Sequence, residues 1–279
     1  MTIDGSMKVG EVRVAKAEDF EQFKRLAEST EKWSLLYDKH GIKVFSKFTE
    51  GTSVKMMKVV TQFSDVPSMV LYDVLHDPEY RRHWDENMIE SYELCKLDGN
   101  NDIGYYSVKC PAPMKNRDFV TQRSWCCKPE EFLIINHTVH HKAAQLKKGY
   151  VRGDSILTGY YVKAKTNGCS LTYVAQVDPK GILPKWVVNR VSSKIAPKVI
   201  HKLHKATMGY KEWKEKHSPE YKPWLKPEQS TLPVIKKEDL EYSELVFESE
   251  QDNDTVQEQE DIGDDTETYS SEDNLDDIL

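Results

Sequence analysis

The sequence contains no long hydrophobic run. No stretch among its 279 residues approaches the roughly 18 apolar residues that a membrane-spanning helix requires. The N-terminus, MTIDGSMKVG, also lacks the apolar segment of a secretory signal peptide. These absences predict a cytoplasmic protein that is not integral to a membrane.

Cysteine is scarce as well. The five cysteines are Cys95, Cys110, Cys126, Cys127 and Cys169. They are odd in number and none belongs to a C-x-x-C pair, which argues against a disulfide framework and against a zinc site. The closest histidines, His137, His140 and His141, have no carboxylate or cysteine at metal-ligand spacing. We therefore expect reduced thiols and no metal.

Motifs of hydrolysis and nucleotide chemistry are missing. The chain has no G-x-S-x-G sequence, no H-E-x-x-H sequence and no glycine-rich phosphate loop. We therefore predict no catalytic residues, no cofactor and no enzymatic activity.

Basic residues are absent from the C-terminal end of the chain. Residues 238–279 hold 18 acidic and no basic side chains, whereas the other 237 residues carry 39 basic and 28 acidic ones, a net charge of +11. An acidic segment of low hydrophobicity cannot bury enough apolar surface to offset the entropy lost on ordering. We predict a flexible N-terminal arm (1–15), one folded domain (16–230) and a disordered acidic tail (231–279).

Hydrophobic periodicity predicts an α+β fold for the domain. Helices are expected over residues 18–27, 67–76 and 184–207, with an extension of the last to 216 left open. Nine strands are expected at 33–37, 42–48, 54–63, 88–96, 103–110, 118–127, 131–139, 154–165 and 169–178. Turn signals such as Asn167-Gly168 join several of them. Nine strands in succession predict one curved antiparallel sheet.

The last helix is amphipathic. Its apolar side comprises Val188, Val191, Ile195, Val199 and Leu203. Lys194, Lys198 and Lys205 form a basic strip beside it. Pro197 lies inside the predicted span, so we expect it to bend the helix.

Two clusters of aromatic and charged residues stand out, YRRHWD (80–85) and MKNRDF (114–119). In a helix, Arg81 and Asp85 share a face, and the carboxylate orients the guanidinium in a way that suits a phosphate. Taken alone, such a pair is also typical of a solvated surface bridge. Tyr106 and Phe119 are equally compatible with ordinary packing in strands.

Three ordered blocks resemble the START lipid-transfer domain, and most closely its phosphatidylcholine transfer branch. They are LYDVLHDPEYRRHWDENMIE (71–90), IGYYSVKCPAPMKNRDFVTQRSW (103–125) and LTYVAQVDPKGILPKWVVN (171–189). The resemblance runs from about residue 16 to about residue 230. It implies the helix-grip fold, a sheet curved around a long C-terminal helix that encloses a lipid tunnel. It also implies that the protein carries one phospholipid between membranes.

The resemblance assigns roles to the clustered residues. Arg81 would bind the lipid phosphate, Asp85 would hold Arg81, and Tyr106 and Phe119 would box the headgroup through cation–π contacts. A third aromatic position of this box aligns near Val174–Ala175, which carries no ring. The pocket is therefore expected to admit phosphatidylethanolamine as well as phosphatidylcholine.

The basic domain predicts an anionic membrane surface as partner rather than nucleic acid, since its aromatic residues alternate along strands that would face a cavity. Lys194, Lys198 and Lys205 are expected to contact that surface, and their helix would form a lid together with the loop 140–153. The tail would compete for the basic surface. Ser270, in SSED, suits an acidophilic kinase of the casein-kinase type, as the resemblance also implies.

Two other functions remain open. A lipid-sensing adaptor would bind lipid without delivering it. A cyclase or hydrolase of the same superfold would need a convergent acid/base pair in the cavity.

Overall fold

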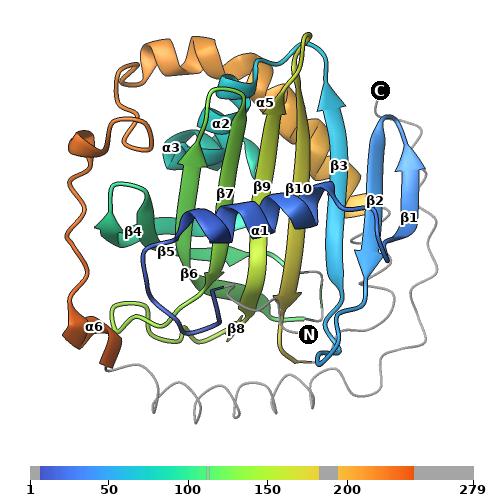
Figure 1. Cartoon of the computed structure of the whole chain (residues 1–279). Helices are drawn as coiled ribbons and strands as arrows, with labels where there is room; N and C mark the ends of the chain where they lie inside the picture. Colours follow the sequence, from blue (N-terminus) through green and yellow to red (C-terminus); the bar gives the residue numbers. More distant parts are fainter. Residues whose placement is uncertain (1–6, 111, 113, 182–193, 242–279) are drawn as a thin grey trace.

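One large sheet dominates the structure (Figure 1). The structure is a computed structural model and describes residues 7–110, 112, 114–181 and 194–241. The sheet has ten strands in the order β1-β2-β3-β10-β9-β7-β6-β5-β4, and β8 pairs in parallel with β6. The strands are β1 (Ser34–Lys39), β2 (Ile42–Lys47), β3 (Met56–Phe63), β4 (Met88–Asp98), β5 (Asn101–Val108), β6 (Asn116–Cys127), β7 (Glu131–Thr138), β8 (Tyr150–Arg152), β9 (Asp154–Ala164) and β10 (Cys169–Asp178).

The nine predicted strands are all present, with ends within two residues of the prediction. Alternation explains this agreement: β2 buries Ile42, Val44 and Ser46 and leaves the residues between them more accessible. The predicted turn between β9 and β10 holds Gly168 at a φ of +78°, and a Cβ there would lie 1.9 Å from the Phe63 carbonyl oxygen. The sequence missed only β8, whose three residues are too short to show a period.

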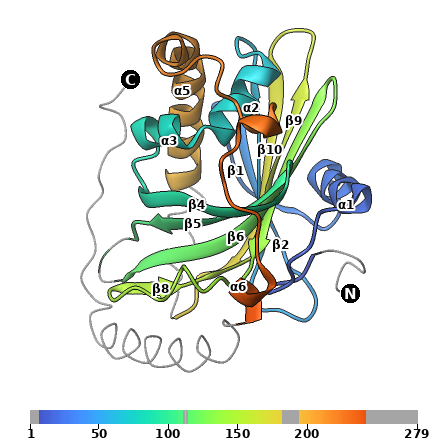
Figure 2. The same ribbon diagram turned by 90° about the vertical axis from the view of Figure 1, so that its left-hand side faces the viewer.

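Helices cover both faces of the sheet (Figure 2). On one face α1 (Ala17–Glu28) packs its buried phenylalanines, Phe20 and Phe23, against residues such as Val174. On the other face lie α2 (Ser68–His76), α3 (Pro78–Trp84) and α5 (Ala196–Lys216). Their core includes Leu171 of β10 and Leu203 of α5. The predicted helix-grip architecture is confirmed.

Two sites fasten α5 to α3 in the interior. Lys214 Nζ lies 2.9 Å from Asp77 Oδ2, and the two side chains are only 7% and 2% exposed. The Tyr210 hydroxyl donates to the same oxygen at 3.0 Å. The Tyr80 hydroxyl donates to the Ala206 carbonyl oxygen at 2.7 Å. The C-terminal half of α5 is therefore fixed in position relative to α3.

The predicted last helix is present and runs to Lys216, the extension that the sequence left open. Its α-helical part begins at Ala196 within the described residues, and residues 184–193 of the prediction lie outside them. Pro197 lies at the start of this α-helical part, directly after residues 194–195, which form a π-helical turn. The buried side runs through Ile200, Leu203 and Tyr210 rather than through Val199, because the interior bonds to Asp77 and Tyr80 set the rotation.

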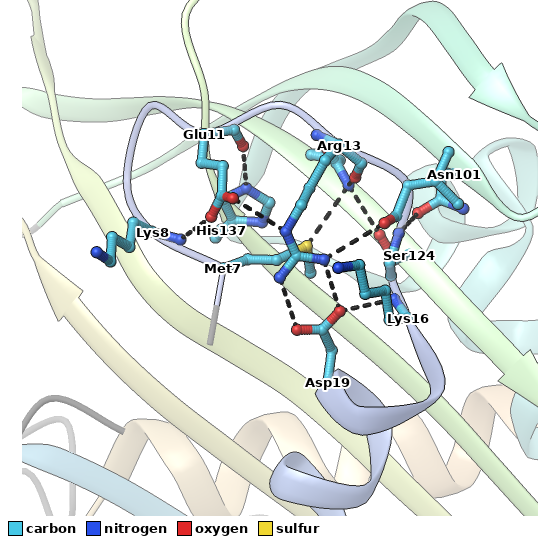
Figure 3. A network of polar contacts seen from close by, with 12 residues as sticks. Met7, Lys8, Glu11, Arg13, Lys16, Asp19, Asn101, Ser124 and His137 are labelled. Carbon is cyan, nitrogen blue, oxygen red and sulfur yellow. Dashed lines mark hydrogen bonds and ion pairs between the residues drawn. The ribbon is translucent and has the colours of Figure 1, made fainter. Parts of the chain in front are cut away.

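The N-terminal arm predicted for residues 1–15 is wrong for residues 7–15, which pack against the sheet (Figure 3). Arg13 and Gln122 exchange two hydrogen bonds through the Arg13 backbone, at 2.7 and 3.3 Å. The Arg13 guanidinium also donates to both Asp19 oxygens, at 2.7 and 2.8 Å. His137 Nε2 lies 2.7 Å from the Glu11 carbonyl oxygen. The sequence gives no sign of the contacts with Gln122 and His137, because these partners lie 109 and 126 positions away from Arg13 and Glu11.

The predicted domain boundary at residue 230 is also too early. Lys96 in β4 donates its backbone N–H to the Pro233 carbonyl, and Ile235 donates to the Lys96 carbonyl, both at 2.8 Å. The chain then forms a short helix, α6 (Lys237–Glu241), after a 3₁₀ turn, η2 (Pro227–Gln229). This segment covers the edge strand β4. Residues 242–279, most of the predicted tail, lie outside the described residues.

Candidate functional site

The Arg81–Asp85 pair sits at the end of α3. Asp77 caps this helix, since its Oδ1 accepts the backbone N–H groups of Glu79 and Tyr80, and Pro78 occupies the first turn. One turn further on, Arg81 Nε donates to Asp85 Oδ2 at 3.0 Å. The i,i+4 pair that the sequence predicts is therefore formed. Asp85 is 7% exposed, whereas 26% of the Arg81 side chain stays accessible.

Tyrosines from three strands surround Arg81. The Tyr106 ring of β5 lies 4.9 Å from the Arg81 guanidinium carbon, and the Tyr106 hydroxyl donates to Asp85 Oδ2 at 3.4 Å. Tyr160 of β9 interacts with Arg81 as well. Its ring packs 4.8 Å from that of Tyr173, the residue directly opposite it in β10. The site thus combines one cation, one anion and three phenols.

The electrostatics of the site keep Arg81 charged. Burial favours the neutral guanidine, but Tyr106, Tyr160 and Asp85 outweigh burial and raise the pKa of Arg81. Burial also raises the pKa values of Tyr106 and Tyr160, although Arg81 works in the opposite direction, so both phenols stay protonated at neutral pH. Because Asp85 occupies only Nε, the terminal nitrogens can donate to an anion. The site can therefore bind a phosphate with hydroxyl groups beside it.

Tyr106 and Phe119 face the same side of the sheet, because they are directly opposite each other in β5 and β6. Tyr106 contacts Arg81. Phe119 lies one strand further from β4, and its ring occupies the space that a Cβ on Gly153 would need, at 2.5 Å. Of the two predicted headgroup residues, Tyr106 thus contacts Arg81 directly, whereas Phe119 packs against Gly153.

The expected absence of a third ring at Val174–Ala175 stays a prediction. Val174 is fully buried on the opposite face, under α1. The preceding residue, Tyr173, faces Tyr160. The signal was available in the sequence: the Asn167-Gly168 turn sets a register that places Tyr160 opposite Tyr173, and both lie at alternating strand positions.

Membrane contact was predicted for three lysines of the last helix and for the loop 140–153. Lys198 and Lys205 of α5 are exposed, and so is Lys194, two residues before α5 begins. The loop 140–153 is anchored rather than free, since Arg152 forms a buried ion pair with Asp118 at 2.9 Å and donates to the carbonyl of Ala144. This anchoring speaks against the loop as a moving lid.

Ser270 lies outside the described residues. Among the described parts of the chain, no helix is long and apolar enough to cross a bilayer, and no group of three or more metal-binding side chains occurs.

A cavity of about 570 Å³ lies on the opposite face of the sheet from Arg81, between α1, the N-terminal segment and the loop 49–52. The charged or titratable side chains in its lining include Asp19 and His137, which are already bonded to Arg13 and Glu11. They hold the N-terminal segment in place. We therefore regard the Arg81 cluster, not this cavity, as the candidate functional site.

Comparisons with known proteins agree with the geometry. Residues 13–214 match the START domain. The chain is 46% identical over 226 residues to START domain-containing protein 10 of Mus musculus, covering 80% of this chain and 78% of that protein. It is 29% identical to the phosphatidylcholine transfer protein of Bos taurus, covering 68% and 91%. The crystal structure of human STARD10 superimposes with a TM-score of 0.77 at 44% identity, covering 82% of this chain and 94% of that one. The chain therefore belongs to the START domain family.

Proposed function

We propose that this protein binds one phospholipid between its sheet and α5 and transfers it between membranes. The observation that carries the proposal is the Arg81–Asp85 pair, an accessible, oriented guanidinium inside a ring of tyrosines. A lipid phosphate that leaves water for a low-dielectric site needs such a fixed cation, because an unpaired buried anion is very costly. The name of the bovine relative states that it transfers phosphatidylcholine, and we extend that activity to this chain.

We propose phosphatidylcholine and phosphatidylethanolamine as the lipids. Tyr106, Tyr160 and Tyr173 offer ring faces to a cationic headgroup, each worth about 0.5–2 kcal/mol, and Phe119 adds a fourth ring on the same face of the sheet. Phenol hydroxyls can also accept hydrogen bonds from a primary ammonium, which a quaternary ammonium cannot donate. The pocket thus suits both headgroups.

We propose that the protein works in the cytoplasm and meets anionic membranes peripherally through Lys194, Lys198 and Lys205. All three lysines are exposed, Lys198 and Lys205 on α5 and Lys194 just before it. The acidic tail would compete with the membrane for this basic surface, and phosphorylation of Ser270 by a casein-kinase-type kinase would add negative charge and strengthen that competition.

The alternatives are less well supported. A cyclase or hydrolase would need a carboxylate available for proton transfer, and Asp85 is already bonded to Arg81 and Tyr106. A lipid-sensing adaptor shares the binding site with a transfer protein, so only a transfer assay separates the two.

The test is Arg81→Ala in a vesicle-to-vesicle transfer assay, with Arg82→Ala as the matched control. Arg82 is the adjacent residue on the same helix, but it is exposed and donates to the Ser91 carbonyl. Leaving a buried phosphate without its cation costs about 2–5 kcal/mol, so Arg81→Ala should slow transfer by more than about thirtyfold. Asp85→Ala should have a smaller effect, because the cation remains. Wild-type transfer by folded Arg81→Ala would refute the assignment.

Mass spectrometry of lipid extracted from the purified protein identifies the headgroup directly. Lipid that co-purifies without any transfer by the wild-type protein would favour the adaptor. Turnover of a small substrate would favour the enzyme.

A further inference from the structure

The sheet ends on one side in a hairpin with an unusual surface. This edge hairpin, residues 32–55, comprises β1, β2 and the loop that leads to β3, and it forms the right-hand edge of the sheet in Figure 1. It carries three large apolar side chains with high exposure: Leu35 at 53%, Leu36 at 46% and Phe48 at 74%. Single exposed apolar residues are common, but three within fourteen positions form an exposed apolar patch of the kind that marks an interaction site.

The register gathers these side chains at one end of the hairpin. Leu35 is opposite Phe45, and Ser34 is opposite Ser46, so Phe48 follows β2 at the end where β1 begins. Lysines surround the patch. Lys55 Nζ lies 4.4 Å from the Phe48 ring centroid and Lys47 Nζ lies 5.7 Å from that of Trp33.

The charge of the hairpin is as distinctive as its apolar patch. Residues 32–55 contain five lysines and two acidic residues, a net charge of +3. Exposed apolar groups ringed by lysines match the boundary of an anionic bilayer, in which the lysines meet the headgroups and the apolar side chains enter below them.

The features of the edge argue against a second copy of the chain as occupant. The β1–β2 pairing is irregular between Leu35 and Tyr37, and Lys39 and Lys43 project from the hairpin. Bulges and edge lysines are devices that prevent strand-to-strand association. Two such hairpins would also bring like charges together, whereas an anionic surface is complementary.

The edge hairpin also adjoins the helix that would admit lipid. His40, in the turn of the hairpin, lies 6.4 Å from His201 of α5 between ring centroids. The exposed Lys198 lies in the first turn of α5 and the exposed Lys194 directly before it, away from the anchors at Ala206, Tyr210 and Lys214. His40 lies at the turn, the end of the hairpin opposite Leu35, Leu36 and Phe48, so the hairpin connects the docked patch to the less anchored half of α5.

We infer that the edge hairpin is a membrane-docking surface that inserts Leu35, Leu36 and Phe48 into an anionic bilayer and so brings the N-terminal half of α5 to the lipid. The inference rests on the proposed function, since it names the surface on which phospholipid exchange takes place.

The experiment compares two double variants of the full chain. Leu36→Ser with Phe48→Ser removes apolar groups from the hairpin. Val234→Ser with Ile89→Ser removes exposed apolar groups from β4 and its covering segment, at the other edge of the sheet. Each is mixed with phosphatidylcholine vesicles that contain a minor fraction of phosphatidylserine, and the bound fraction is measured by co-sedimentation.

The hairpin variant should bind these vesicles at least about tenfold more weakly than wild type, and the control variant should bind within about twofold. Lys47→Glu with Lys55→Glu should weaken binding as well, and added salt should reduce the difference from wild type. Thermal denaturation checks that each variant is folded.

Equal binding by the hairpin variant and wild type would overturn the inference. So would a wild-type dimer in sedimentation velocity that the hairpin variant dissociates, because the patch would then belong to a second copy. The amount of phospholipid that co-purifies is measured separately. A hairpin variant that keeps its lipid but loses vesicle binding separates docking from lipid binding, whereas wild-type protein without lipid would refute the proposed function alone.

Discussion

Asp77 offers the sharpest test of how α3 and α5 are held together. One carboxylate serves two elements: Oδ1 accepts the backbone N–H groups of Glu79 and Tyr80 at the start of α3, and Oδ2 accepts from Tyr210 and Lys214 of α5. All of this lies in the interior, with Asp77 only 2% exposed. Changes at this residue should therefore affect both helices at once.

The expected magnitudes differ for the two partners of the ion pair. Asp77→Ala removes the cap, worth about 1 kcal/mol, and leaves the buried Lys214 ammonium unpaired, which costs about 3–5 kcal/mol. Lys214→Met is milder, because Asp77 keeps its two backbone donors and the Tyr210 hydroxyl. We expect the free energy of unfolding to fall by about 4–6 kcal/mol for Asp77→Ala, and by clearly less for Lys214→Met.

Urea denaturation of both single variants and the double variant measures this directly. In the double variant the unpaired ammonium is gone, so its destabilisation should be smaller than the sum of the two single effects. Additive effects, or a loss below about 1 kcal/mol for Asp77→Ala, would refute the claim that this carboxylate joins the two helices. The control is Lys216→Met, which changes an exposed lysine two residues after Lys214 on the same helix.

Three further predictions concern other parts of the protein. Lys58 is 3% exposed, and burial, together with Lys47, lowers its pKa from 10.5 to about 8. Between pH 8 and pH 10.5 the folded state therefore binds fewer protons than the unfolded state, so the free energy of unfolding should rise with pH in this range. Lys58→Met should abolish that rise and stabilise the fold at pH 7 by up to about 3 kcal/mol. A destabilised Lys58→Met protein would contradict this. Tyr160→Leu should reduce the preference for choline over ethanolamine lipids in a competition assay by up to about tenfold, through the loss of one cation–π face; an unchanged preference would place the headgroup elsewhere. Truncation after Glu241, which retains the segment that covers β4, should raise transfer to anionic vesicles at low salt, with the difference vanishing at high salt; equal rates at low salt would mean that the tail does not restrain the domain.

The strands and the Arg81–Asp85 pair could be predicted because both depend on neighbours in the sequence. Strand alternation has a period of two, and the pair lies four residues apart in one short helix. Of the three tyrosines around Arg81, the sequence predicted one. Tyr106 followed from the resemblance, but Tyr160 and Tyr173 required the register of a hairpin some eighty residues further along the chain.

Buried polar residues were the systematic failure. Asp77 and Lys214 are 137 positions apart, and each alone reads as a surface charge. The same holds for Arg13, whose backbone bonds to Gln122 turn an apparent loose arm into part of the fold. A charged residue can be buried only when its partner is present, and the partner is set by long-range packing that composition does not show.

By itself, the sequence determined the class of fold, the number and limits of most strands, the local pairing of Arg81 with Asp85 and the separation of basic domain from acidic end. These properties follow from side-chain period, turn residues and charge count, which are local. Only the tertiary structure decided which rings face Arg81, which half of α5 is anchored, and that exposed Leu35, Leu36 and Phe48 gather at one edge. Those outcomes depend on strand order and register, which bring together residues that no local pattern connects.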